Sequence, residues 1–420
     1  MRVELVSIGN ELLLGQTVNT NSSWMARELI QYGIQTSRIT TISDSRSDIL
    51  NMLRETGERA EIVIITGGLG PTSDDITKPV LCEFFETDLI LDQGILEHIK
   101  SLLAIRGVEI NDLNIRQAEV PASAHILHNA MGTASGLWLE KNGTVYISLP
   151  GVPFEMKALI TDMVIPKLRE KFPFPEVYYK TVITQGSFEA YLAERLKAFE
   201  ANLPPNMNFA YLPSPGIIRL RIGSTGDDAK KLERAVNSQV LKLQEIIPEY
   251  IVGFDDDTLE LIIGSMLMIR NQSLSIAESC TGGAVSALIT SVPGSSSYFK
   301  GGIVAYSNEI KRDQLAIDRS LIETYGAVSK LVVEDMAINT RLLFNTDYAV
   351  SVSGIAGPGG GSSDKPVGTT WIGVSCKNKT YSEIFRFGDN RERNIQRASV
   401  AALNMLRKLI ISQDLIIDSN

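Results

Sequence analysis

A serine and a cysteine stand side by side in AESCTGG at 277–283, directly before a glycine pair. Either Ser279 or Cys280 could attack a carbonyl carbon, and each would need a base to remove its proton. The chain has only three histidines, all in its first third: His98, His125 and His128. Because no histidine of the C-terminal half can help, a Cys280 thiolate would depend on a helix dipole and a nearby cation alone. We therefore favour Ser279 as the nucleophile.

The base that this serine needs is offered by YSNEIK at 306–311. Tyr306 is expected to end a strand, and Lys311 to lie in the first turns of the next helix. Burial and the helix dipole would both lower the pKa of Lys311, so that a neutral amine could take the serine proton. Each residue also has a purely structural interpretation, with Ser279 as a helix cap, Tyr306 as a core aromatic and Lys311 as a solvated charge.

Glycine-rich loops flank the predicted serine–lysine site. The backbone N–H groups of Thr281, Gly282 and Gly283 open a predicted helix and could stabilise an oxyanion. The loop SGIAGPGGG at 353–361 follows a buried strand and suits a phosphate or a ribose, although a flexible connection is the alternative.

A second candidate site lies in TGGLGPTSDD at 66–75, directly after a buried strand. The glycines free backbone N–H groups to approach an anion, and the paired aspartates suit a divalent metal beside a phosphate. The expected anion-binding residues are Thr66, Gly67, Gly68 and Gly70. The expected metal ligands are Asp74 and Asp75, with Glu11 and Asp44 from strand ends on the same edge. A tight turn followed by a helix cap is the structural alternative.

The segment GNELLLGQTVNTN at 9–21 follows a neighbouring strand and should reach the same crevice. We expect Asn10 and Asn21 to contact a nucleotide or a phosphate. Capping of the next helix explains Asn21 equally well.

The elements that must position these residues alternate in type. In domain 1–170 we expect strands near 3–9, 34–42 and 62–66, and helices near 21–32, 46–58, 76–86, 92–106, 111–119 and 153–171. In domain 253–420 we expect strands near 274–278, 302–306, 348–353, 367–376 and 381–387, and helices near 257–270, 281–291, 308–316, 329–345 and 390–412. Such alternation predicts two three-layer α/β domains.

Between these domains, residues 171–252 form a predicted small α+β module. KFPFPEV at 171–177 marks its start, because paired prolines break regular structure. The expected order is a strand, a helix, a hairpin and a helix, which is similar to KH-type RNA-binding modules. The G-x-x-G loop that clamps RNA in those modules is missing.

Composition bounds the partners of the chain. Its 420 residues are 44% hydrophobic and carry 40 basic against 49 acidic side chains, a net charge of −9. This balance disfavours a global electrostatic grip on nucleic acid or an anionic membrane. Three cysteines without a C-x-x-C pair offer neither a disulfide framework nor a zinc site. Without a signal peptide or an apolar run of about 20 residues, we expect a cytoplasmic, soluble protein.

Three ordered motifs make residues 1–170 similar to the N-terminal domain of the CinA family: GNELLLGQTVNTN, TGGLGPTSDD and LPGVPFEM at 149–156. That domain has the fold of the molybdopterin-binding domains of molybdenum cofactor synthesis. The resemblance implies cleavage of ADP-ribose to AMP and ribose 5-phosphate, dependent on a divalent metal (Mg, Mn or Co). It matches acidic positions of the cofactor-synthesis relatives to Asp44 and Asp75. A pterin- or nucleotide-binding transferase of that type is the alternative.

The C-terminal motifs resemble, in order, the nicotinamide mononucleotide deamidase domain of the same family: AESCTGG, GGIVAYSNEIK, GAVS at 326–329, GIAGP and KPVGT. The resemblance implies a nucleophile at Ser279, assisted by Tyr306 and Lys311, and no metal or other cofactor for this step. The implied ligand-contacting positions are Ser353, Gly354, Ala356, Gly357 and Arg393. The family commonly has threonine where this chain has Ser353. Arg391 could also pair with a phosphate.

The resemblance implies a bifunctional pyridine-nucleotide salvage hydrolase. Its substrates would be nicotinamide mononucleotide and ADP-ribose, and a homodimer is a further expectation from the family. The competence-related family name leaves another alternative, a non-catalytic partner in DNA uptake or repair.

Overall fold

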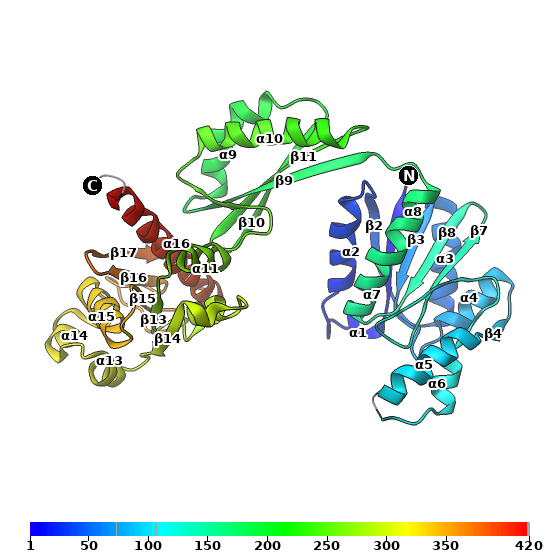
Figure 1. The fold of residues 1–420 in the computed structure, drawn as a ribbon, viewed down its shortest axis with the longest axis horizontal. Coiled ribbons are helices and arrows are strands. Elements are labelled where there is room, and N and C mark those ends of the chain that lie inside the picture. The colour runs from blue at the N-terminus through cyan, green and yellow to red at the C-terminus, as the bar shows by residue number, and fades with distance from the viewer. Residues whose placement is uncertain (73, 106, 418–420) are drawn as a thin grey trace. The chain divides into compact units, whose positions relative to one another are not determined.

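The computed structural model describes residues 1–72, 74–105 and 107–417. The chain divides into two compact units (Figure 1). One consists of Met1–Tyr178 with Thr225–Leu232, and the other of Tyr179–Ser224 with the chain after Leu232. No helix in the described part of the chain combines the length and the apolar character that crossing a bilayer requires.

The first domain is built around a six-stranded sheet of order β2-β1-β3-β8-β7-β6. In chain order its elements are β1 (Val3–Ile8), α1 (Asn10–Leu13), α2 (Thr20–Ile30), β2 (Thr36–Ile42), α3 (Arg46–Arg59), β3 (Ile62–Thr66), α4 (Thr77–Phe85), β4 (Leu89–Leu91), α5 (Gln93–Ile105), α6 (Asp112–Gln117), β5 (Glu119–Pro121), β6 (His125–Leu127), β7 (Gly136–Lys141), β8 (Thr144–Leu149), α7 (Pro153–Leu159), the π-helical turn η1 (Ile160–Val164) and α8 (Ile165–Lys171). Strands β2, β1, β3 and β8 run parallel, and β7 and β6 are antiparallel to their neighbours.

Helices cover both faces of this sheet (Figure 1). On one face Leu5 and Ile64 pack with α2, α7 and α8. On the other face Val6 and Ile65 pack with α3, α4 and α5. Strands β1, β3 and β8 are buried along their whole length, as expected for central strands covered on both sides. The predicted three-layer α/β fold of this domain is confirmed.

The structure adds elements that were not expected in this domain, α1 and β4–β8, and it divides one expected helix. The hairpin β7–β8 was not predicted, although Asn142 and Gly143 adopt the positive φ angles of 52° and 84° that a two-residue hairpin turn requires. The single helix expected at 153–171 contains η1 in its middle. Pro166 lacks the N–H that an α-helical bond to Asp162 would need, so the turn before it widens.

A four-stranded sheet of order β10-β11-β9-β12 follows the first domain. Its elements are β9 (Glu176–Gln185), α9 (Glu189–Ala201), β10 (Met207–Ser214), β11 (Ile217–Gly226), α10 (Ala229–Ile246) and β12 (Ile251–Phe254). The predicted order of strand, helix, hairpin and helix is present, with β12 added at the edge. Ile183 and Val252 belong to the same buried cluster as the core of the C-terminal domain. The boundary at residue 252 stays a prediction.

The C-terminal domain has a five-stranded sheet of order β14-β13-β15-β16-β17. Its elements are α11 (Leu259–Arg270), β13 (Leu274–Glu278), α12 (Ala284–Thr290), the 3₁₀ turn η2 (Ser295–Ser297), β14 (Phe299–Val304), α13 (Asn308–Leu315), α14 (Arg319–Tyr325), α15 (Lys330–Leu343), β15 (Tyr348–Gly354), β16 (Thr369–Cys376), β17 (Thr380–Arg386) and α16 (Arg391–Ile417). Helices α11, α12 and α16 pack on one face, and α13, α14 and α15 on the other. The second three-layer α/β fold is therefore confirmed, with α14 as an additional helix.

Candidate active sites

The structure brings Ser279 and Lys311 together at the carboxyl edge of the C-terminal sheet. Ser279 directly follows β13, and Lys311 is the fourth residue of α13. Lys311 Nζ lies 3.0 Å from Ser279 Oγ, and it donates to the carbonyl oxygens of Ala305 at 2.6 Å and Tyr306 at 3.4 Å. A neutral amine has two N–H bonds, which these carbonyls can accept, and a lone pair that remains for the Ser279 hydroxyl.

Burial makes this lysine a candidate base. Only 1% of Lys311 is exposed. Loss of hydration lowers the pKa of its amine, and the neighbouring Cys280 opposes this shift. The solvated-charge interpretation of Lys311 is therefore wrong.

The rival nucleophile Cys280 lies in an environment that keeps it protonated. Burial raises the pKa of its thiol to about 12, and its own backbone N–H and the attraction of Lys311 offset this only in part. At neutral pH the residue is therefore a thiol and a poor nucleophile. Its sulfur packs against Gly354, at the start of the glycine-rich loop 353–361. A Cβ added to Gly354 would lie only 3.0 Å from Sγ.

The predicted oxyanion donors need a correction. Gly282 N–H donates to the Ser279 carbonyl at 3.1 Å, and Gly283 N–H donates to the Glu278 carboxylate at 3.0 Å. Neither amide is free, so the assignment of Gly282 and Gly283 was wrong. Within the described chain, the N–H groups of Cys280 and Thr281 have no acceptor. Thr281 therefore stays a candidate, and Cys280 N–H joins it.

Helix α16 connects Tyr306 to the glycine-rich loop 353–361, called the ligand loop below. The phenol of Tyr306 is 58% exposed, which excludes a core role, and its oxygen accepts from Arg391 Nη2 at 3.1 Å. Arg391 Nη1 donates to the Gly357 carbonyl at 2.8 Å. Asn394 Nδ2 donates to the Ala356 carbonyl at 3.0 Å. The start of α16 thus holds the loop beside Tyr306.

Two further residues predicted to contact the ligand, Ser353 and Arg393, differ in their burial. Ser353 lies buried at the end of β15, and its Oγ donates to the Ala327 carbonyl at 2.8 Å, which joins the loop to GAVS. The side chain of Arg393 is exposed, and its backbone N–H donates to Asn390. Arg391, and not Arg393, contacts Tyr306 and the loop. The ligand-contacting role that the resemblance implies for Arg393 stays a prediction.

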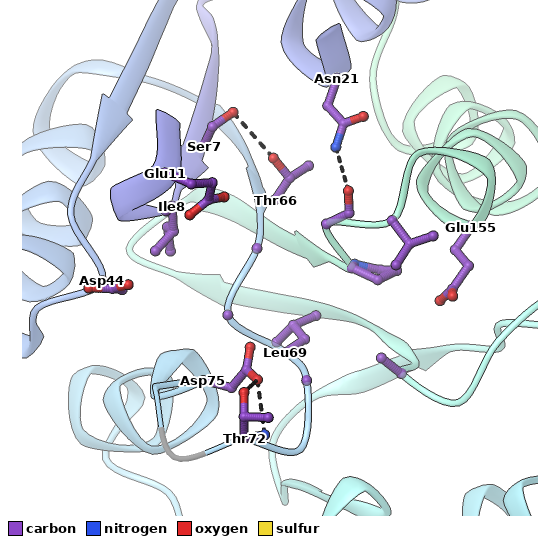
Figure 2. Close-up of a pocket in the computed structure, with 18 of the residues that line it drawn as sticks. Ser7, Ile8, Glu11, Asn21, Asp44, Thr66, Leu69, Thr72, Asp75 and Glu155 are labelled. Atoms are coloured by element: carbon purple, nitrogen blue, oxygen red, sulfur yellow. Dashed lines mark hydrogen bonds between the residues drawn. The ribbon is translucent and has the colours of Figure 1, made fainter. Parts of the chain in front are cut away.

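A cleft of about 760 Å³ opens at the carboxyl edge of the N-terminal sheet (Figure 2). It is lined by nine of the ten predicted residues: Glu11, Asn21, Asp44, Thr66, Gly67, Gly68, Gly70, Asp74 and Asp75. The prediction that the two loops share one crevice is confirmed. The tenth, Asn10, donates to Asp44 Oδ1 at 2.5 Å and orients that carboxylate instead.

Backbone N–H groups in this cleft are available to an anion. Gly67 N–H donates to the Leu149 carbonyl at 3.1 Å, which joins β3 to β8. In the described ranges, the N–H groups of Gly68, Leu69 and Gly70 have no acceptor. Three successive free amides suit a phosphate, as the glycine pattern predicted.

We expect Gly67→Ala to destabilise the N-terminal domain far more than Gly15→Ala. Both glycines have positive φ angles, 107° and 70°. A Cβ on Gly67 would lie 2.3 Å from the Ile8 carbonyl oxygen, whereas nothing lies within 4 Å of one on Gly15. Gly15→Ala should cost about 1 kcal/mol of backbone strain. Hydrogen exchange of the central strands measures both, and equal losses would contradict the steric argument.

The four predicted metal ligands do not converge in one cluster. Asp75 Oδ2 accepts from Thr72 N–H at 3.0 Å and Thr72 Oγ1 at 2.5 Å. No three acidic, histidine or cysteine side chains of the described residues gather closely enough to hold a cation. Magnesium is commonly held by one or two carboxylates together with substrate phosphates. A cation in this cleft would therefore need a substrate phosphate beside one or two of the lining carboxylates, such as Asp44 and Asp75.

Asn21 reaches across the cleft and is not a cap. Asn19 caps α2 by accepting from Ser22 N–H. Asn21 Nδ2 donates to the Gly151 carbonyl at 2.7 Å, as Figure 2 shows. Its Oδ1 is buried without a partner among the described residues. Of the two interpretations of Asn21, ligand contact therefore remains.

Sequence reasoning missed three residues that shape these sites, Glu155, Glu278 and Asn394, and did not foresee the contacts of Arg391 with Tyr306 and Gly357. Glu155 lies on the cleft wall opposite Asp44 in Figure 2 and accepts from Asn129 Nδ2 at 2.7 Å. Its signal was its place in LPGVPFEM. Arg391 had been weighed only as a phosphate partner. Asn394 gave no local signal, because its partners are distant backbone carbonyls.

Two family descriptions match the two domains. Residues 4–170 match the probable molybdopterin binding domain, and residues 256–410 match the CinA C-terminal domain. Fold and sites thus define a protein that joins a molybdopterin-binding type of domain to a second α/β domain with a buried serine–lysine pair.

Full-length relatives identify the family. A CinA-like protein of Cytophaga hutchinsonii is 44% identical over 96% of this chain and 97% of its own length. A CinA-like protein of Flavobacterium psychrophilum is 44% identical over 98% of this chain and 99% of its own. The chain belongs to the CinA family. The crystal structure of the competence/damage inducible protein CihA from Agrobacterium tumefaciens has 36% identity and a TM-score of 0.36, and covers 36% of this chain and 93% of that one.

Proposed function

We propose that the C-terminal domain hydrolyses the carboxamide of nicotinamide mononucleotide to nicotinate mononucleotide and ammonia. The observation that carries the proposal is the buried Lys311 Nζ at 3.0 Å from Ser279 Oγ. This arrangement supports amide hydrolysis because a neutral lysine can activate a serine without histidine. The nucleotide substrate comes from the family resemblance, and the exposed Arg391 beside Tyr306 is suited to its anionic part.

In the proposed reaction, Ser279 Oγ attacks the carboxamide carbon while Lys311 takes the serine proton. The N–H groups of Cys280 and Thr281 hold the developing oxyanion. Lys311 returns the proton to the departing nitrogen, the C–N bond breaks, and ammonia leaves. Water then attacks the acyl-enzyme ester, with Lys311 again as the base, and the carboxylic acid is released.

The pH dependence of this reaction follows from the lysine. The neutral amine is the active form, and its population rises with pH through the pKa of Lys311. Because burial lowers that pKa from its ordinary 10.5, kcat/KM for ammonia release should rise through a pH below 10.5. The assay is ammonia release by the purified chain in EDTA. A profile that rises only near 10.5, or falls with pH, would contradict Lys311 as the base.

We propose that the N-terminal domain cleaves ADP-ribose, with AMP and ribose 5-phosphate as products. The amides of Gly68, Leu69 and Gly70, which have no acceptor among the described residues, support this proposal, as does the cleft of about 760 Å³ that Asp75 also lines. A divalent ion bound by Asp75 and Asp44 would neutralise charge on the diphosphate. The amides would orient its oxygens. Formation of both products with added Mg, Mn or Co tests the proposal.

The match to the molybdopterin binding domain favours one alternative, a pterin- or nucleotide-binding transferase. Tight pterin binding without ADP-ribose turnover would favour it. A non-catalytic role in competence or repair would instead leave the phenotype of a Ser279→Ala strain unchanged. The homodimer and the cytoplasmic location stay predictions.

A further inference from the structure

The carboxylate next to the proposed nucleophile is buried and fully bonded. Glu278 is the last residue of β13, directly before Ser279, and 1% of it is exposed. Its Oε2 accepts from Gly283 N–H at 3.0 Å and Val285 N–H at 3.1 Å. Its Oε1 accepts from Ser286 N–H at 2.8 Å and Ser286 Oγ at 2.7 Å.

These four bonds tie the end of the loop 279–283 and the first turn of α12 to Glu278. Gly282 and Gly283 adopt positive φ angles of 64° and 103°, so the chain reverses tightly after Ser279. The reversal folds the amides of Gly283, Val285 and Ser286 back onto Glu278, and Gly282 N–H donates to the Ser279 carbonyl. Because they already donate to Glu278 or to the Ser279 carbonyl, these amides cannot bind a ligand. The N–H groups of Cys280 and Thr281 remain, and they are the ones nearest to Ser279 in the chain.

We propose that Glu278 is the positioning residue of this loop, and that it holds the N–H groups of Cys280 and Thr281 toward the carbonyl oxygen of a bound acyl substrate. Glu278 does not touch the substrate. The inference rests on the proposed acyl-transfer function of this domain. It identifies the Glu278 carboxylate as the group that keeps the oxyanion-binding amides in place.

A second observation at the same loop points to a ligand. The Thr281 hydroxyl is buried and has no partner among the described residues, and 3% of Thr281 is exposed. A buried hydroxyl without a hydrogen-bond partner is unfavourable. This hydroxyl is therefore a candidate donor to a substrate oxygen held at the same loop.

The purely structural explanation is that Glu278 only caps α12. The two explanations differ in what Glu278→Gln does to Ser279. A glutamine keeps one acceptor oxygen but turns an NH₂ group toward amide donors, which disturbs the loop. Ser286→Ala is the matched control, because it removes one of the four donors and leaves the carboxylate in place.

The test is the rate at which a fluorophosphonate probe labels Ser279. Serine oxygen forms a bond to phosphorus, the P–F bond breaks, fluoride leaves, and Lys311 takes the proton. Labelling needs the nucleophile and the oxyanion donors, but not the nucleotide substrate. We expect Glu278→Gln to lower the labelling rate about 100-fold, and Ser286→Ala to change it less than about 3-fold. With nicotinamide mononucleotide, kcat should fall while KM stays within about 3-fold.

Each outcome bears on the inference. Labelling of Glu278→Gln at the parental rate would overturn it, as would an equal loss in Ser286→Ala. If Glu278→Gln does not fold, Glu278→Asp retains the charge on a shorter arm, and a parental labelling rate in that folded variant would overturn the inference. A parent that is labelled but releases no ammonia contradicts the proposed substrate alone. A parent that is not labelled contradicts the nucleophile and the inference together.

Discussion

Replacing Lys311 by methionine should reduce ammonia release from nicotinamide mononucleotide by at least about a thousandfold, and Ser279→Ala should do the same. Methionine keeps most of the buried stem of Lys311 and removes the amine, whose Nζ lies 3.0 Å from Ser279 Oγ. Among the described residues, this amine is the hydrogen-bond partner of Oγ that can take its proton, and methionine offers no replacement. Single-turnover and steady-state ammonia assays measure the loss.

The stability of Lys311→Met separates chemistry from folding. Burial of an amine is unfavourable, which is why the pKa of Lys311 is lowered. Its removal should therefore leave the melting temperature unchanged or higher. A variant that loses both activity and structure would not support the base assignment.

Cys280→Ala is the control for the choice of nucleophile. Since burial raises the pKa of its thiol to about 12, the variant should keep activity within about 5-fold. Loss of activity in Cys280→Ala together with its retention in Ser279→Ala would reverse the assignment.

Asp75→Asn should abolish metal-dependent cleavage of ADP-ribose, with a loss of at least about 100-fold, and leave ammonia release unchanged in the same preparation. Asparagine keeps the shape and one acceptor oxygen for the bonds from Thr72, but it removes the charge that a cation needs. EDTA should act on the parent in the same selective way. Product formation from both substrates, measured side by side, checks the prediction.

Asp162→Asn is the matched control for this experiment. Asp162 is exposed on η1 and does not line the cleft. Its replacement should leave both activities unchanged. A parental rate of ADP-ribose cleavage in Asp75→Asn, or full activity of the parent in EDTA, would contradict the proposed cation site.

The overall architecture was predictable because its signals are local. Buried runs such as IVIIT at 62–66 and glycine turns at their ends predicted the strands and the edge where ligands gather. The missed β7–β8 hairpin also had a local signal, Asn142 followed by Gly143, which should have been used. The widened turn η1 likewise follows from Pro166, once its missing N–H is considered.

The details of the sites depended on contacts between distant segments. Gly282 and Gly283 were expected to open a helix, and α12 does begin directly after them, but the sequence could not tell that Glu278 would occupy the Gly283 amide. Two arginines at the start of α16 were indistinguishable by pattern. The helix directs Arg391 toward Tyr306, 85 positions away in the chain, and leaves Arg393 exposed.

By itself, the sequence determined the two α/β domains, the loops that carry the candidate chemistry and the exclusion of histidine from the C-terminal site. The tertiary structure decided which side chains meet and which amides remain free. The physical reason is that turn and strand preferences act over a few residues. A hydrogen bond such as that between Lys311 and Ser279 depends on how α13 packs against the sheet, and burial by the whole domain lowers the pKa of the lysine.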